Sequence, residues 1–178
     1  IEKPTKIIGK VDGVEMKIPK TLQEAKSRVI ITDTGFDPLF GFSGGLASLV
    51  RYFAGDAIAE AFRRRKNNYP SPGEETASSL FANEFANFLN ESVSIEILPS
   101  KDGISGIHCG NLIDAHTSAS KQLLDTSRVS MKRDIHALIV STAGNGSDST
   151  LADGLKAVWN VVGGMKDKGH LTLIAECS

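Results

Sequence analysis

A glycine-rich turn at the start of a helix constrains the fold of this chain more than any other feature. Residues 41–55 read GFSGGLASLVRYFAG, and they follow the apolar run at 29–31, which predicts a β-strand. A helix that begins after a strand presents free backbone N–H groups and the positive end of its dipole. Such a helix start suits phosphate or carboxylate groups. The stretch contains neither lysine nor histidine, so it predicts an anion-binding turn without an evident reactive group.

A second loop, at residues 141–149, has a similar placement. It leaves the apolar strand expected at 137–140 and enters a helix expected over about 150–165. Open α/β sheets bind ligands at this end of their strands. The segment Gly144-Asn145-Gly146 is not a full dinucleotide fingerprint, and no Walker lysine follows it. Two interpretations therefore stay open, an anion or substrate site and an ordinary strand–helix turn.

These two loops define the predicted ligand site. We expect any ligand to be a small anionic molecule held between them, because both supply N–H groups at helix starts. A lysine outside the loops would add a positive charge. The predicted site residues are Ser43, Gly44, Gly45, Lys101, Ser141, Gly144 and Asn145. The alternative is that both loops only cap helices and hold water.

Strands alternate with helices along the chain, which predicts an α/β fold with a parallel or mixed sheet and helices on both faces. We expect one domain over residues 1–178, with two sub-lobes, 1–70 and 71–178, as the alternative division. Capping patterns predict helix starts at Thr21, with Glu24, and at Ser71, with Glu74. The second of these helices should bury an apolar face made of Ala77, Leu80, Phe81, Phe85, Phe88 and Leu89.

Composition excludes several classes of partner. The 178 residues carry a net charge of −1, and this net charge gives no general attraction to nucleic acid or to a membrane surface. No apolar run reaches the roughly 20 residues that a membrane helix needs, and no signal peptide is visible. The two cysteines, Cys109 and Cys177, are typical of a reduced cytoplasmic protein. We therefore expect a cytoplasmic protein.

Polar residues at 108–116 are weaker candidates for chemistry. His108, Asp114 and His116 flank the start of a helix expected at 112–124, but their spacing is not a recognised metal-ligand pattern. No Ser–His–Asp set can be assembled either. The sequence therefore predicts no metal site.

Four segments together resemble the nickel-dependent lactate racemase family. Residues 41–55 resemble its Gly-Phe/Tyr-Ser-Gly-Gly motif. Residues 108–116, HCGNLIDAH, are similar to its Ala-Gly-Asp-x-x-x-Ala-His segment, and residues 134–143 and 171–177 resemble its closing βαβ unit. The resemblance covers the middle and C-terminal portion of a family member. It implies a racemase or epimerase of 2-hydroxy acids that uses a nickel pincer nucleotide, attached through a lysine, for hydride transfer.

When the family's functional positions are matched to this sequence residue by residue, several of them hold a different residue type here. The attachment lysine falls at Ala47 and the arginine before it at Leu46, while the nickel-ligand histidine falls near Phe62. The catalytic histidine of the preceding loop falls near Asp37. The motif's proline and glycine become Arg51 and Tyr52, and Lys101 loosely matches a lysine near the cofactor. We therefore expect no cofactor on this chain, because alanine cannot hold the nucleotide covalently and phenylalanine cannot ligate nickel.

Two functions follow from the resemblance and the departures. One is a lactate racemase-like 2-hydroxy acid racemase, inactive as an isolated chain. The other is a non-catalytic module with the same fold that binds a small anion or has a regulatory role. The sequence also predicts a partner for this chain, either an N-terminal lobe or a second copy in a homo-oligomer. We expect a cluster near the glycine turn, Phe36, Leu39, Phe40 and Tyr52, to be either an apolar face that meets this partner or local core.

Overall fold

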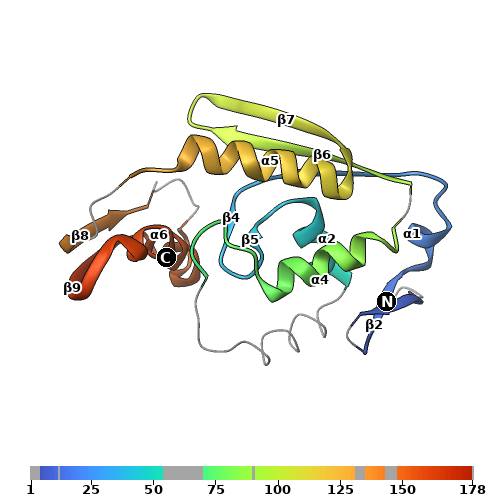
Figure 1. The fold of residues 1–178 in the computed structure, drawn as a ribbon, viewed down its shortest axis with the longest axis horizontal. Coiled ribbons are helices and arrows are strands. Elements are labelled where there is room, and N and C mark those ends of the chain that lie inside the picture. The colour runs from blue at the N-terminus through green and yellow to red at the C-terminus, as the bar shows by residue number, and fades with distance from the viewer. Residues whose placement is uncertain are drawn as a thin grey trace. The chain divides into compact units, whose positions relative to one another are not determined.

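The computed structural model describes residues 5–11, 13–53, 70–89, 91–130, 135–142 and 148–177. The chain divides into two compact units, Ile1–Ser127 and Arg128–Ser178. The boundary between these units lies after residue 127, whereas the sequence offered 70/71 as an alternative internal boundary. Figure 1 labels the helices and strands of both units.

The first unit begins with a hairpin and a short helix. Strands β1 (Thr5–Val11) and β2 (Val14–Pro19) pair antiparallel and bury Met16 and Ile18. Helix α1 (Lys20–Glu24) follows directly, and Pro19 is its N-cap residue. The predicted capping box at Thr21 is therefore wrong. Thr21 already lies inside the helix, and no side chain caps this helix start.

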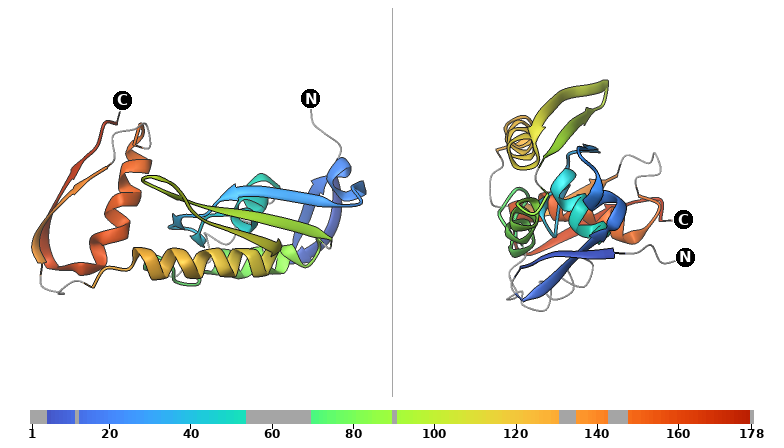
Figure 2. Two further views of the ribbon diagram at one scale, coloured as in Figure 1. Left: turned by 90° about the horizontal axis from the view of Figure 1, so that it is seen from above. Right: turned by 90° about the vertical axis from the view of Figure 1, so that its right-hand side faces the viewer.

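A three-stranded mixed sheet forms the centre of the first unit, which confirms the predicted α/β fold with a mixed sheet; among the described residues, helices cover one face of this sheet and not both. Strand β6 (Ser92–Ser100) lies between β3 (Arg28–Asp33), to which it is parallel, and β7 (Gly103–Asn111), to which it is antiparallel. Helix α5 (Leu112–Ser127) contacts both β6 and β7, as Figure 2 shows from above. Side chains alternate along β6, so Ser94, Glu96 and Leu98 are buried toward the helices.

Two further helices complete the layer beside α5. Helix α2 (Gly45–Phe53) follows a short antiparallel pair, β4 (Phe36–Asp37) and β5 (Gly41–Phe42). Helix α4 (Ala77–Ala86) begins at the N-cap Thr76, not at Ser71 as the sequence predicted. The reason is that Glu74 accepts the Ser71 N–H at 2.8 Å within a turn, while Thr76 and Ser79 form the actual capping box.

The core of the first unit joins the hairpin, α2 and α4. Phe81, Phe85 and Leu89 are buried in it, as predicted, but Ala77 is exposed, and Leu80 and Phe88 remain 48% and 39% exposed. Phe40 also belongs to this core, while Tyr52 is 83% exposed. The cluster predicted near the glycine turn is therefore not one exposed apolar face.

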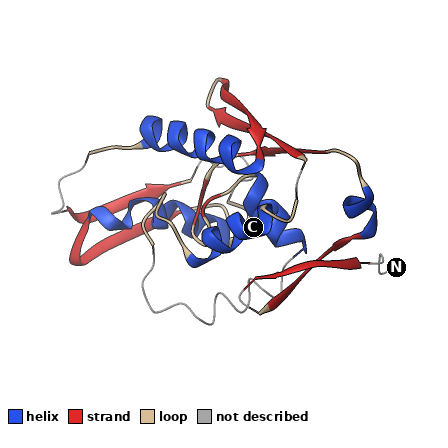
Figure 3. Ribbon diagram, turned by 45° about the vertical axis from the view of Figure 1, so that its right-hand side comes forward, coloured by secondary structure: helices blue, strands red, loops and turns tan. Residues whose placement is uncertain are grey.

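The second unit is the predicted βαβ unit. Strands β8 (Ile135–Ser141) and β9 (Met165–Ile174) pair in parallel, and the chain between them forms α6 (Leu151–Val161) and a 3-10 turn at Val162–Gly164. Figure 3 shows the helices and strands of the chain by type. Both cysteines are free and exposed. Among the described residues, no helix combines the length and apolar character that crossing a membrane requires.

Candidate functional site

A buried glutamate occupies the helix start that the sequence predicted to bind an anion. Glu96 lies on β6 with its side chain fully buried. Its carboxylate accepts the Gly45 N–H at 2.8 Å, the Ser94 hydroxyl at 3.1 Å and the Thr34 hydroxyl. A backbone N–H at the start of α2 is therefore already bonded to a carboxylate of the protein itself.

A histidine from α5 stands beside this carboxylate. Nδ1 of His116 lies 3.6 Å from Oε1 of Glu96, and the His116 side chain is 16% exposed. Burial raises the pKa of Glu96, but the His116 imidazole and the hydrogen bonds from Thr34 and Gly45 outweigh burial and hold that pKa below its ordinary value. The carboxylate is therefore ionised at neutral pH, and it faces Nδ1 of the imidazole.

The two glycines of the turn are explained by this Glu96–His116 pair. Gly44 has a φ of +141°, and a Cβ on it would stand 2.8 Å from Nδ1 of His116. A Cβ on Gly45 would stand 2.9 Å from Oε1 of Glu96. The turn needs glycine because the carboxylate and the imidazole pack directly against its backbone.

A cavity of about 210 Å³ opens beside the pair, between α2, α4 and α5. Phe42, Leu46 and Ala47 give it an apolar side. His116, Thr117 and Ser120 line it from α5. The Ser120 hydroxyl is buried, and no described residue hydrogen-bonds to it. A buried polar group without a partner is costly, which marks this wall as a place where a ligand would gain a hydrogen bond.

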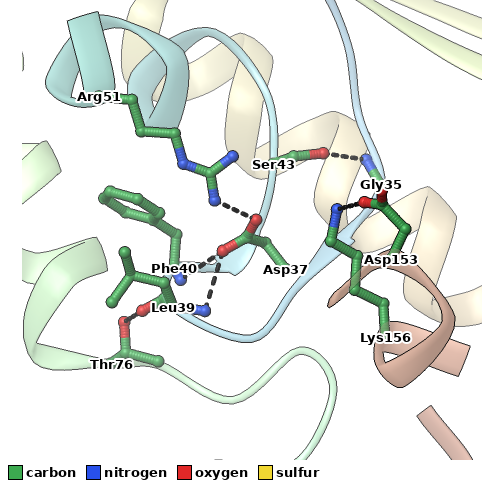
Figure 4. Close-up of polar contacts among 9 residues, drawn as sticks. All are labelled: Gly35, Asp37, Leu39, Phe40, Ser43, Arg51, Thr76, Asp153 and Lys156. Atoms are coloured by element: carbon green, nitrogen blue, oxygen red, sulfur yellow. Dashed lines mark hydrogen bonds and ion pairs between the residues drawn. The ribbon is translucent and has the colours of Figure 1, made fainter. Parts of the chain in front are cut away.

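An ion pair closes the loop that precedes the glycine turn (Figure 4). Asp37 is 4% exposed and accepts the N–H groups of Leu39 and Phe40 at 2.9 and 3.0 Å. Its other oxygen pairs with the Arg51 guanidinium, which lies 5.2 Å from the centroid of the Phe40 ring. Both Asp37 oxygens are therefore engaged in holding the loop against α2.

The predicted site residues fall in both units. Ser43 accepts the Gly35 N–H at 2.9 Å, and Lys101 lies exposed in the turn between β6 and β7. Ser141 ends β8 in the second unit, whereas Gly144 and Asn145 lie outside the described residues. Because each unit is described by itself, an anion held jointly by the two loops stays a prediction.

The three polar residues considered as metal ligands have separate partners. His108 hydrogen-bonds Gln122 at 2.7 Å, Asp114 accepts the Asn111 amide at 2.6 Å, and His116 faces Glu96. Within the part of the chain that the structure describes, no three His, Cys, Asp or Glu residues gather as metal ligands.

Sequence reasoning missed Glu96, the residue around which the site is built. A signal was present, because the run SVSIEIL alternates polar and apolar residues with a charge in the middle of a strand. Alternation of that kind is usually a solvated face, and here the polar residues point inward.

Comparison with solved structures identifies proteins that have a similar fold. The lactate racemase apoprotein from Thermoanaerobacterium thermosaccharolyticum superposes with a TM-score of 0.79 at 20% identity, covering 97% of this chain and 43% of that chain. A structural genomics protein from Thermotoga maritima superposes with a TM-score of 0.53 at 13% identity, covering 82% of this chain and 42% of that one. No protein-family model and no curated protein sequence matches the chain. The chain therefore has a lactate racemase-like α/β fold and spans less than half of either solved chain.

Proposed function

We propose that this chain is a non-catalytic ligand-binding module with a lactate racemase-like fold. Its ligand is a small 2-hydroxy acid or a similar anion, bound in the cavity beside His116. In this proposal the chain does not itself carry out racemisation by hydride transfer.

The Asp37–Arg51 pair is the observation that carries the proposal. The family resemblance implies a catalytic histidine near Asp37 and a proline at Arg51. In this chain the two replacements bond to each other, and Asp37 also accepts two backbone N–H groups. An aspartate that is 4% exposed and bonded through both oxygens is poorly placed to act as an acid or base on a ligand. The loop that would carry the chemistry is therefore used to hold the fold.

The residues near the glycine turn do not fit the nickel pincer nucleotide. Ala47, at the position implied for the attachment lysine, lines the cavity with a methyl group and offers no nucleophile. Phe62, at the position implied for the nickel-ligand histidine, lies outside the described residues.

The cavity has the polarity that a small hydroxy acid needs. The imidazole of His116 can donate to a carboxylate, and the hydroxyls of Thr117 and Ser120 can bond to the ligand's own hydroxyl. Phe42, Leu46 and Ala47 would contact the aliphatic part of such a molecule. Glu74 and Glu75, which also line the cavity, are exposed, so water screens their repulsion of an anion.

Titration of the chain with D-lactate, L-lactate, glycolate and phosphate tests the proposal, with backbone amide NMR shifts as the readout. We expect the hydroxy acids to shift the amides of Phe42, Ala47 and Ser120. His116→Gln should weaken binding about tenfold or more, because a hydrogen bond to a charged group contributes about 1.5–3 kcal/mol. His108→Gln is the matched control, because His108 lies on β7 and bonds Gln122 away from the cavity lining.

The same samples decide between binding and racemisation. With nickel present, chiral chromatography of the lactate samples should show no interconversion. Racemisation that depends on His116 would overturn the non-catalytic proposal in favour of an active 2-hydroxy acid racemase. The absence of shifts around the cavity with every compound would overturn the ligand class.

A further inference from the structure

We infer that the outer face of the β3-β6-β7 sheet is a docking surface for helices of a larger lactate racemase-like polypeptide, helices that lie outside these 178 residues. This inference concerns a surface and a partner, and it does not depend on what the cavity binds.

The outer face of this sheet is apolar across all three strands. Val29 and Ile31 of β3 are 62% and 63% exposed, and Ile107 of β7 is 57% exposed. The strand register places side chains of the same face next to each other in rows. The rows are Val29 with Val93, Ile31 with Ile95 and Cys109, and Ile97 with Ile107.

The opposite face of the same sheet is covered. His116 of α5 and Gly45 of α2 meet Glu96 on the inner side of β6, and Gln122 of α5 meets Gly106 of β7. The parallel pair β3–β6 is connected through α2 and α4, and sheets built from such connections usually carry helices on both faces. A contiguous apolar face of this kind is characteristic of an interaction site.

The extent of the match to the solved lactate racemase supports further residues of the same polypeptide as the occupant. The match takes up 97% of this chain but only 43% of that chain, so more than half of the solved chain has no counterpart here. A polypeptide of that length has enough further chain to supply a helical layer. A second copy of this chain would instead place one sheet face on another.

A native thiol makes the surface measurable. Cys109 lies on this face beside Ile95, and it is exposed in the described chain. In the polypeptide expressed from its complete reading frame, we expect iodoacetamide to alkylate Cys109 at least tenfold more slowly in the native state than in urea. Peptide mass spectrometry separates Cys109 from Cys177. Alkylation of Cys109 at the unfolded rate would overturn the inference.

Two isoleucines provide a matched pair of variants. Ile31 and Ile7 are 63% and 48% exposed in this chain, but Ile31 lies on the outer face of this sheet while Ile7 lies on β1, in the separate β1-β2 sheet. In the complete polypeptide, Ile31→Lys should lower the melting temperature clearly more than Ile7→Lys. Equal effects of the two variants would overturn the inference. Light scattering and dilution test the second copy. If the protein has the mass of a dimer and Cys109 loses its protection on dilution, the face belongs to a second copy, and the proposed occupant is wrong.

Discussion

The starts of α2 and α6 have similar positions in the chain, but they are stabilised by different hydrogen bonds. Each helix follows a strand and a loop, and the sequence predicted an anion at each. In both, a carboxylate of the protein accepts a backbone N–H. Glu96 accepts the N–H of Gly45 at the start of α2. Asp148, two residues before the N-cap Thr150 of α6, accepts the Glu176 N–H at 3.0 Å and the Thr142 hydroxyl.

The difference lies in how far along the chain the partner comes from. The Glu96 carboxylate is 51 residues away from the Gly45 N–H to which it bonds. In the second unit, the Asp148 carboxylate is 28 residues away from the Glu176 N–H and six from Thr142, while the first turn of α6 is capped by the Thr150 hydroxyl, three residues from the Asp153 N–H to which it bonds. The first N–H of α2 therefore depends on β6 being in place, whereas the capped N–H of α6 depends on a side chain of its own helix start.

Among changes at the two helix starts, removing the Glu96 carboxylate should have the largest effect. Glu96→Ala leaves the Thr34 hydroxyl, the Gly45 N–H and His116 buried or half-buried without their partner. We expect a loss of about 3–5 kcal/mol in the free energy of unfolding of the first unit. Urea denaturation followed by far-UV circular dichroism measures it. Glu84→Ala, at an exposed position of α4, is the control, and an equal effect of the two variants would refute the central role of Glu96.

Acid should weaken the first unit through the same carboxylate, but less than its removal, because a protonated Glu96 keeps its volume and one acceptor. In the folded protein the pKa of Glu96 is lowered, so the unfolded chain takes up its proton at a higher pH. The contribution is complete above the ordinary glutamate pKa of about 4.3 and is lost as the pH falls through the folded pKa.

Urea midpoints at pH 7, 4 and 3 measure this dependence. Glu96→Gln should flatten it in the first unit. Trp159, the single tryptophan of the chain, lies on α6 and reports the second unit by its fluorescence. An unchanged slope in Glu96→Gln would show that other carboxylates dominate the acid response.

Local signals explain which parts of the fold could be predicted from sequence. The hairpins, the strand before the glycine turn, α5 and the βαβ unit each depend on periodicity or on turn residues within a few positions. Helix starts were less predictable. Thr21-Leu22-Gln23-Glu24 and Ser71 with Glu74 both match a capping pattern, yet Pro19 and Thr76 are the actual N-caps. Several residues near each boundary could cap, and packing against the core decides among them.

The candidate site could be predicted only in part for the same reason. The glycine turn was found because it is a continuous motif. Its occupant, Glu96, belongs to a strand that is remote in sequence, and no local pattern connects the two. His116 was considered as a metal ligand with its sequence neighbours, whereas in the fold it faces Glu96 on the adjacent strand. The positions of Asp37 and Arg51 were both noted as departures from the family, but only the structure shows that they pair.

Adding a methyl group to the glycine turn tests the close contact with the Glu96–His116 pair. Gly44 has a positive φ, and a Cβ there meets His116 at 2.8 Å. Gly103 also has a positive φ, of +129°, but a Cβ there meets nothing within 4 Å. Gly44→Ala should therefore destabilise the first unit by about 1–3 kcal/mol, and clearly more than Gly103→Ala. Equal losses in urea denaturation would mean that backbone conformation alone requires glycine at Gly44.

The smallest effect should come from the locally capped helix of the second unit. The Thr150 hydroxyl accepts the Asp153 N–H at 3.2 Å at the exposed start of α6. Thr150→Ala should cost about 1 kcal/mol, the usual contribution of an N-cap side chain. Trp159 fluorescence during urea denaturation measures the loss, and Thr150→Ser should restore stability because serine keeps the capping hydroxyl. A loss as large as that of Glu96→Ala would contradict the comparison, since it would mean that the start of α6 depends on more than its own cap.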